Sequence, residues 1–505
     1  MRHFRTGSLS VIVIAAGVLC ISPATAARKR GSQAQPSAPA GLVTFELSAL
    51  GPRNEPVTDL RSGECQVSED GKRQAITLFH YDGNSRKKDS PNGPQEFSNR
   101  DGFAVRPTIV LLDLLSERLL TWGQAEGELV KALEGVPSGD GLYVYILMNQ
   151  GSFYAVHALP KTEAELRTEN PKWTQEVRPL LDGVSRELAG FRPMDDQDPW
   201  LRTQLTVRVL GQFAASLAVI PGRKNLVWIT HGIPTVVPGL NPGEPVDLRP
   251  QLRQLGESFV QANVAVYTVA QSAAGAGESM GYSWESLQLL SSLTGGRPYS
   301  SDNIGNAITE ATADAWASYV VGYYPSREKD DGKFHKLRVT CARKGLRLQT
   351  QAGYWAFLVQ SSPAEREHAA LEAAAVSPFD NSGIGLRLTV APHEKPSTTA
   401  RVQIYIDSAD LLPPDQSDPH HRDLAIELVA YTANGTIQRA TTSLFQPNQD
   451  QAGKKEIEVS RDLAIDDASQ NIRVIVYDGN LNLTGSVTIP IIPAAIHPER
   501  PSGKS

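Results

Sequence analysis

The sequence predicts an α/β protein with a doubly wound sheet and flanking all-β sandwich domains of the immunoglobulin-like type. Two observations lead to this fold class. Strand and helix patterns alternate from residue 107 to about 318, which is typical of a parallel sheet covered by helices. Short strands separated by polar turns precede this block and return after it. A chain of 505 residues has room for about two to four domains.

The chain begins with the pattern of a secretory signal peptide over residues 1–26. Arg2 and Arg5 precede a short apolar core, and the small residues ATA end at position 26. The core is too short to predict a membrane span, and no later segment is longer. We therefore expect export to the periplasm or the extracellular space. Residues 27–40, rich in Ser, Pro, Gln and Ala, are expected to form a disordered tether.

The charge balance indicates no nucleic-acid partner. The chain has 49 Lys and Arg against 55 Asp and Glu, a formal net charge of −6. Proteins that bind nucleic acids typically carry a cluster of basic residues on one surface. A net negative charge does not predict such a surface.

A split β-sandwich is expected around the alternating block. Residues 41–80 contain short strands and the hairpin sequence EDGK, whereas residues 81–106 are polar and read as a loop or linker. Strand patterns resume at 319–357. Each half has too few strands to cover a core alone, so we expect the halves to pair around a domain inserted at about 104–318.

Two cysteines remain after signal cleavage, and each lies in a strand of a different half. In an oxidising compartment Cys65 and Cys341 could form a disulfide that joins the halves. Alternatively, both are buried thiols that pack as small hydrophobic residues. The sequence leaves both alternatives open.

The spacing of apolar residues predicts the helices and strands of the domain inserted at about 104–318. Buried strands read as continuous apolar runs, and helices place apolar residues on one face every three to four positions. In chain order we expect a strand at 107–115, a helix at 117–136, two strands within 141–159, helices at 171–190 and 200–220, a strand at 224–232, a helix at 250–262, a strand at 264–272, a helix ending at Gly295 and a helix at 303–318.

The C-terminal third predicts a second sandwich. Residues 358–379, rich in Ala and Glu, are expected to be a linker or a short helix, and about seven short alternating strands follow within 380–492. Residues 493–505 are expected to form a disordered tail.

Asp113 is the first candidate site residue, because it ends the apolar run at 109–112. Open α/β sheets bind ligands beyond the carboxyl ends of their strands. The expected ligand-binding face comprises Asp113, Ser116, Glu117, Thr230 and His231. In the alternative interpretation, Asp113 accepts backbone N–H groups at the start of the following helix.

Seven separated motifs follow one another along the chain: DLRSGECQVSEDGKRQAITLF, IVLLDLL, IPGRKNLVWITHGIP, ANVAVYTV, LTGGRPY, SYVVGYYP and FHKLRVTCARKGLRLQTQAGY. In this order they resemble the von Willebrand factor A (VWFA)-related proteins that are widespread in acidobacteria. The resemblance implies an exported protein built around a von Willebrand A-like domain at 104–318. We predict that it acts as a non-catalytic, adhesion-type module that binds a protein or cell-envelope ligand.

The family resemblance also implies a degenerate metal-ion-dependent adhesion site. Such a site uses an Asp, two Ser, a distant Thr and a second Asp, because hard cations prefer oxygen ligands. Asp113 matches the first position, whereas Leu115 and Glu117 replace the serines and His231 stands where the second Asp would be. We therefore expect no cofactor; Mg²⁺ or Ca²⁺ bound by Asp113 and Glu117 is the less favoured alternative.

No catalytic motif was found, and we predict that the chain is not an enzyme. HExxH, GxSxG, CxxC and Walker sequences are all lacking. Two alternatives remain open. One is an envelope hydrolase with a site in the loops at 232–250 or 272–282, and the other is a purely structural envelope component.

Overall fold

The computed structural model describes most of the chain between residues 42 and 491. The signal peptide, the tether, nearly all of the predicted helix at 171–190 and the predicted tail lie outside the described residues. The described ranges are 42–81, 96–99, 106–115, 122–135, 141–148, 150–161, 165, 178, 181, 199–238, 244–271, 279–300, 303–326, 331–356, 362–390, 399–411, 423–447 and 454–491.

The largest sheet in the described part has six strands. Its order is β13-β12-β9-β6-β7-β8, with every neighbouring pair parallel except the antiparallel hairpin of β7 and β8. The strands are β6 (Thr108–Asp113), β7 (Leu142–Leu147), β8 (Phe153–His157), β9 (Lys224–Thr230), β12 (Val264–Ala270) and β13 (Pro298–Tyr299).

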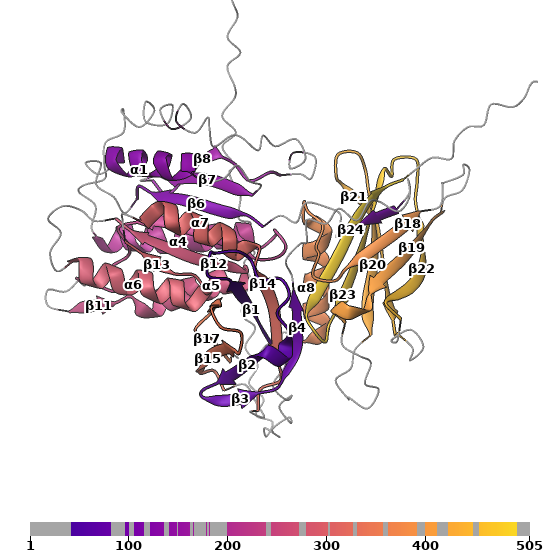
Figure 1. Ribbon diagram of the computed structural model, residues 1–505. Coiled ribbons are helices and arrows are strands. Elements are labelled where there is room, and N and C mark those ends of the chain that lie inside the picture. Colours follow the sequence, from indigo (N-terminus) through magenta and orange to yellow (C-terminus); the bar gives the residue numbers. More distant parts are fainter. Residues whose placement is uncertain are drawn as a thin grey trace, which may run out of the picture. The chain divides into compact units, whose positions relative to one another are not determined.

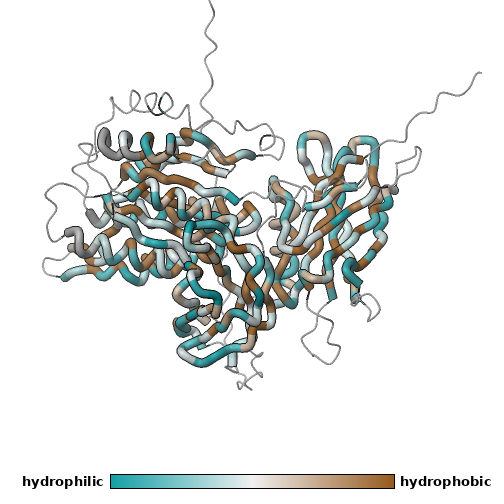
Figure 2. The backbone as a smooth tube through the Cα atoms, viewed as in Figure 1, coloured by the Kyte–Doolittle hydropathy of each residue, from teal (hydrophilic) through white to brown (hydrophobic). Residues whose placement is uncertain are grey.

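Helices cover both faces of this sheet because successive side chains of a strand point to opposite faces. Ile109 and Leu111 of β6 pack with α4 (Pro199–Leu217), α5 (Arg249–Gln261) and α6 (Ser279–Thr294). Val110 and Leu112 pack instead with α1 (Trp122–Gly135) and α7 (Ile304–Ala315). Hydrophobic residues concentrate along the strands between these layers (Figures 1 and 2). A short hairpin of β10 (Val236–Pro238) and β11 (Pro245–Asp247) lies in the loop before α5.

Two four-stranded sheets combine the segments on either side of the six-stranded sheet. Cys341 lies opposite Cys65 in the pairing of β15 with β2, and the two form a disulfide. One sheet has the order β16-β1-β14-β4, and the other has the order β17-β15-β2-β3. Their strands are β1 (Val43–Leu50), β2 (Cys65–Glu69), β3 (Lys72–Gln74), β4 (Ile76–Tyr81), β14 (Ser318–Tyr323), β15 (Phe334–Cys341), β16 (Arg347–Thr350) and β17 (Gly353–Trp355).

The C-terminal segment, together with β5 from the segment at 81–106, forms two further four-stranded sheets that share one core. Their orders are β22-β19-β18-β5 and β21-β20-β23-β24. The strands are β5 (Glu96–Ser98), β18 (Leu386–Val390), β19 (Thr399–Asp407), β20 (Leu424–Tyr431), β21 (Ile437–Phe445), β22 (Glu456–Ala464), β23 (Asn471–Asp478) and β24 (Leu483–Pro490).

The segment expected as a loop or linker and the segment expected as a linker or short helix both contribute ordered elements. Within 81–106, β5 pairs with β18, and the amide of Asn99 donates to the backbone oxygens of Asn381 and Ile384. Within 358–379, α8 (Pro363–Val376) begins at Ser362, whose hydroxyl accepts the N–H of Glu365. This capping arrangement stabilises the helix start.

The predicted fold class, a doubly wound α/β protein with flanking sandwiches, is wrong for this chain. Strands hold 44% of the described residues and helices 27%, and the strands are distributed over six small sheets. The six-stranded sheet is mixed, because β8 runs antiparallel to β7. The prediction gave too much weight to the alternation at 107–318, whereas β-rich segments before and after it make the chain mainly β.

Within the described residues, no helix combines the length and the apolar character that crossing a membrane requires.

Candidate functional site

Asp113 is held at the carboxyl end of β6 by hydrogen bonds that include three from described residues. Its side chain is 0% exposed. Oδ1 accepts the backbone N–H of Leu115 at 3.0 Å. Oδ2 accepts the indole N–H of Trp228 at 3.2 Å and the hydroxyl of Thr230 at 2.8 Å. Trp228 and Thr230 alternate with Ile229 on β9, so they share one face and tie two neighbouring strand ends together.

The turn after β9 continues this network. The Thr230 hydroxyl accepts the N–H of Gly232 at 3.0 Å. Gly232 has φ of +83°, and a Cβ there would lie 3.1 Å from Ser283, so this tight turn requires glycine. His231 is partly buried, and its Nδ1 lies 3.0 Å from the carbonyl oxygen of Gln271.

The structure thus brings together part of the predicted ligand-binding face. Asp113 and Thr230 are in contact, and His231 follows directly in the chain with its ring nitrogen at Gln271 rather than at Asp113. Ser116 and Glu117 lie outside the described residues. Oδ1 of Asp113 accepts the backbone N–H of Leu115, whereas α1 begins at Trp122 and residues 116–121 lie outside the described part. The helix-start interpretation of Asp113 therefore stays a prediction, and the donors from β9 were not anticipated.

The described part of the loop at 232–250 is anchored to α6. The Thr235 hydroxyl donates to Glu285 at 2.9 Å, and the Arg249 guanidinium contacts the same carboxylate at 2.9 and 3.1 Å. The Arg249 guanidinium, together with Thr235, lowers the pKa of Glu285. These contacts hold Thr235 and Arg249 against α6. The greater part of the loop at 272–282 lies outside the described residues.

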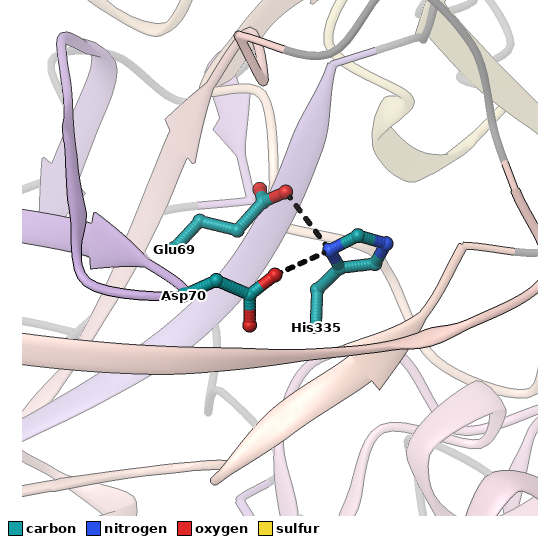
Figure 3. Close-up of side chains that lie close together, drawn as sticks. All are labelled: Glu69, Asp70 and His335. Atoms are coloured by element: carbon teal, nitrogen blue, oxygen red, sulfur yellow. Dashed lines mark hydrogen bonds and ion pairs between the residues drawn. The ribbon is translucent and has the colours of Figure 1, made fainter.

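A second cluster of ionisable side chains lies in the split sandwich. The carboxylates of Glu69 and Asp70 approach the same ring nitrogen of His335 (Figure 3). Nδ1 of His335 is 2.8 Å from Oδ2 of Asp70 and 3.3 Å from Oε1 of Glu69. Glu69 and His335 are buried, whereas the side chain of Asp70 is 48% exposed.

Each member of this cluster has a further partner. Oε2 of Glu69 accepts the hydroxyls of Tyr323 at 2.6 Å and Tyr354 at 3.0 Å. The backbone N–H of Lys336 donates to Oδ1 of Asp70, and Oδ1 of Asp331 lies next to Nε2 of His335, both at 2.9 Å. The Lys336 N–H, with a smaller contribution from His335, lowers the pKa of Asp70, and His335 lowers that of Asp331.

The cluster of Glu69, Asp70 and His335 was not predicted from the sequence. The residues EDGK indicated only a hairpin, and Glu69 and His335 are far apart in the chain. They meet because β2 pairs with β15 in a register that sets Glu69 opposite Leu337. The pattern of apolar residues does not specify that register. Cys65 and Cys341, which lie in the same two strands, were the one indication in the sequence that these strands could be neighbours.

Comparison with known proteins gives no family assignment. No family model matches the chain, and no curated protein matches it. Among solved structures, the human COPII-coat protein Sec24c aligns at TM-score 0.26 and 10% identity, covering 77% of this chain and 44% of that one. The pilus adhesin SpaC from Lactobacillus rhamnosus GG aligns at TM-score 0.27 and 10% identity, covering 77% and 54%. The chain therefore spans about half the length of these proteins or less, and TM-scores this low do not establish a shared fold.

Proposed function

We propose that this chain is an exported, non-catalytic member of the VWFA-related proteins. In this proposal it binds a protein or cell-envelope ligand at the carboxyl edge of the six-stranded sheet. The observation that carries the proposal is the network of Asp113, whose buried carboxylate accepts hydrogen bonds from β9 and from Leu115. This network gives the edge a fixed shape, and a preorganised surface loses less conformational entropy on binding.

Binding at this edge is proposed to need no cation. A metal-dependent adhesion site requires carboxylate oxygens that a Mg²⁺ or Ca²⁺ ion can reach, with open coordination positions for the partner. The side chain of Asp113 is 0% exposed, and both of its oxygens accept internal hydrogen bonds. Asp113 therefore positions the strand ends instead of contacting the ligand.

The contact residues in this proposal are those around Asp113. His231 is partly buried at the turn that Thr230 and Gly232 fix, and Ser116 and Glu117 follow Asp113 in the chain. The order of motifs shared with the VWFA-related proteins supports an exported binding role for this edge.

Site-specific photo-cross-linking tests the proposal. A benzophenone amino acid replaces His231 in the mature chain, which is incubated with the cell-envelope fraction of the source organism and irradiated. The matched control replaces Val219, which is 43% exposed and precedes the amino end of β9. We expect a discrete adduct from position 231 and none from position 219. Equal labelling from both positions, or no adduct from position 231, would contradict the proposal.

A further inference from the structure

We propose that Glu69, Asp70 and His335 bind a divalent transition-metal ion, with Zn²⁺ as the best match. This site lies in the split sandwich, and the inference is independent of the proposed binding edge. One imidazole nitrogen and two carboxylate oxygens are ligands that Zn²⁺ takes in proteins. The three candidate ligand atoms lie within 4.8 Å of one another.

The position of Asp331 orients the imidazole for metal binding. Oδ1 of Asp331 lies 2.9 Å from Nε2 of His335, so Nε2 carries the proton and donates it to this carboxylate. In the neutral ring, the lone pair of Nδ1 then faces Glu69 and Asp70. Metal-binding histidines typically donate their other ring N–H to a carboxylate in this way, which fixes the tautomer.

The two carboxylates require positive charge at Nδ1. Their oxygens lie 2.8 and 3.3 Å from that nitrogen, and a lone pair facing two anionic oxygens is repulsive. A proton on Nδ1 meets this need with one hydrogen bond, to Oδ2 of Asp70. A cation among the three atoms meets it by contacting all of them, so the two carboxylate oxygens and Nδ1 form a set of ligand atoms that a cation can occupy.

The other oxygen of each carboxylate is held by groups outside the triad. Tyr323 and Tyr354 donate to Oε2 of Glu69, and Oε1 of the same carboxylate lies 3.3 Å from Nδ1 of His335. The backbone N–H of Lys336 donates to Oδ1 of Asp70, which directs Oδ2 to the same place. Such outer partners orient ligands before the metal arrives.

The spacing is close to that of a coordinated ion. Zn²⁺ bonded at about 2.1 Å in tetrahedral geometry sets its ligand atoms roughly 3.4 Å apart. The two measured separations from Nδ1, 2.8 and 3.3 Å, need only a small outward movement of Asp70. The side chain of Asp70 is 48% exposed, so this movement is open to it and an ion can enter from solvent.

Calorimetric titration of Zn²⁺ into the chelator-treated, disulfide-intact mature chain at pH 7.5 tests the site. We expect close to one Zn²⁺ per chain and a rise in Tm on binding, because the ion binds only the folded site. His335→Gln should abolish both effects. Asp331→Asn should weaken binding by about 10- to 100-fold, since it removes an outer partner and no metal ligand.

The matched control is His368→Gln, because His368 is exposed on α8 and belongs to no cluster of metal-binding side chains in the described residues. It should bind Zn²⁺ as the wild type does. If His335→Gln does not fold, Asp331→Asn decides the matter. No stoichiometric Zn²⁺ binding, binding of Ca²⁺ in preference to Zn²⁺, or an affinity unchanged in Asp331→Asn would overturn the proposal.

Discussion

The phenolic hydroxyl of Tyr267 donates a 2.5 Å hydrogen bond to Oδ2 of Asp314, and both side chains are fully buried. The other oxygen of Asp314 accepts the hydroxyl of Ser48 at 2.6 Å. Asp314 on α7 therefore connects β12 of the six-stranded sheet with β1 of the split sandwich. Burial, reinforced by the Asp314 charge, raises the pKa of Tyr267.

Tyr267→Phe should lower the free energy of unfolding by about 1–3 kcal/mol, because it removes a donor from a buried carboxylate. Tyr324→Phe is the control, since Tyr324 is 42% exposed, and it should change stability by less than about 0.5 kcal/mol. Urea unfolding followed by fluorescence measures both. Equal effects of the two substitutions would show that the Tyr267 contact adds nothing.

Thr230→Val tests the network at the strand ends. The substitution keeps the shape of the side chain but removes the donor to Asp113 and the acceptor for Gly232. We expect a loss of about 1–3 kcal/mol in urea unfolding. Thr309→Val, on the exposed face of α7, is the matched control. A stability equal to that of the control would mean that Asp113 does not depend on Thr230.

The disulfide should contribute substantially to stability. Cys65 and Cys341 are separated by 276 residues, so the bond closes a long loop of the unfolded chain. Replacing both by Ala should cost about 2–5 kcal/mol, and thiol counting on the oxidised, unfolded wild type should find no free thiol at Cys65 or Cys341. Two free thiols per chain would show that the bond does not form.

Lys224 makes the stability depend on pH. It is almost fully buried, and burial lowers its pKa from 10.5 to about 7. Between pH 7 and 10.5 the unfolded chain therefore binds more protons at this residue than the folded chain, so its contribution to stability rises with pH in this window. Below about pH 7 both states carry the proton and the full cost of burying the charge is present.

Lys224→Met should remove this dependence. The difference in unfolding free energy between wild type and variant should move in favour of the wild type as pH rises from 7 to 9, by at most about 1.4 kcal/mol per pH unit. Urea unfolding at several pH values measures it. A difference that is constant over this range would mean that Lys224 is charged in the folded protein.

The pattern of apolar and polar residues predicted individual helices and strands better than it predicted which strands pair and in which register. The apolar run before Asp113 is β6, with the carboxylate at its end as expected. The indole N–H of Trp228 reaches Asp113 only because β6 and β9 pair in one parallel register, which no local pattern specifies. The strand β5 was not predicted, because it has only three residues and lies in a polar segment. It pairs with β18 through backbone groups, and so short a strand shows no clear alternation of apolar and polar residues.

The same limit explains the error in fold class and the missed cluster. Alternation at 107–318 was visible, but how the remaining strands divide among sheets depends on long-range pairing. The approach of Glu69 to His335 is set by the pairing of β2 with β15. Residues that meet through register cannot be found by reading either strand alone.

The most direct test of the proposed function is cross-linking from position 231 in the presence of EDTA and in the presence of Mg²⁺. If the buried carboxylate of Asp113 only positions the edge, the same adduct should form with equal yield in both conditions. An adduct that requires Mg²⁺ and disappears with EDTA would contradict a cation-independent binding edge.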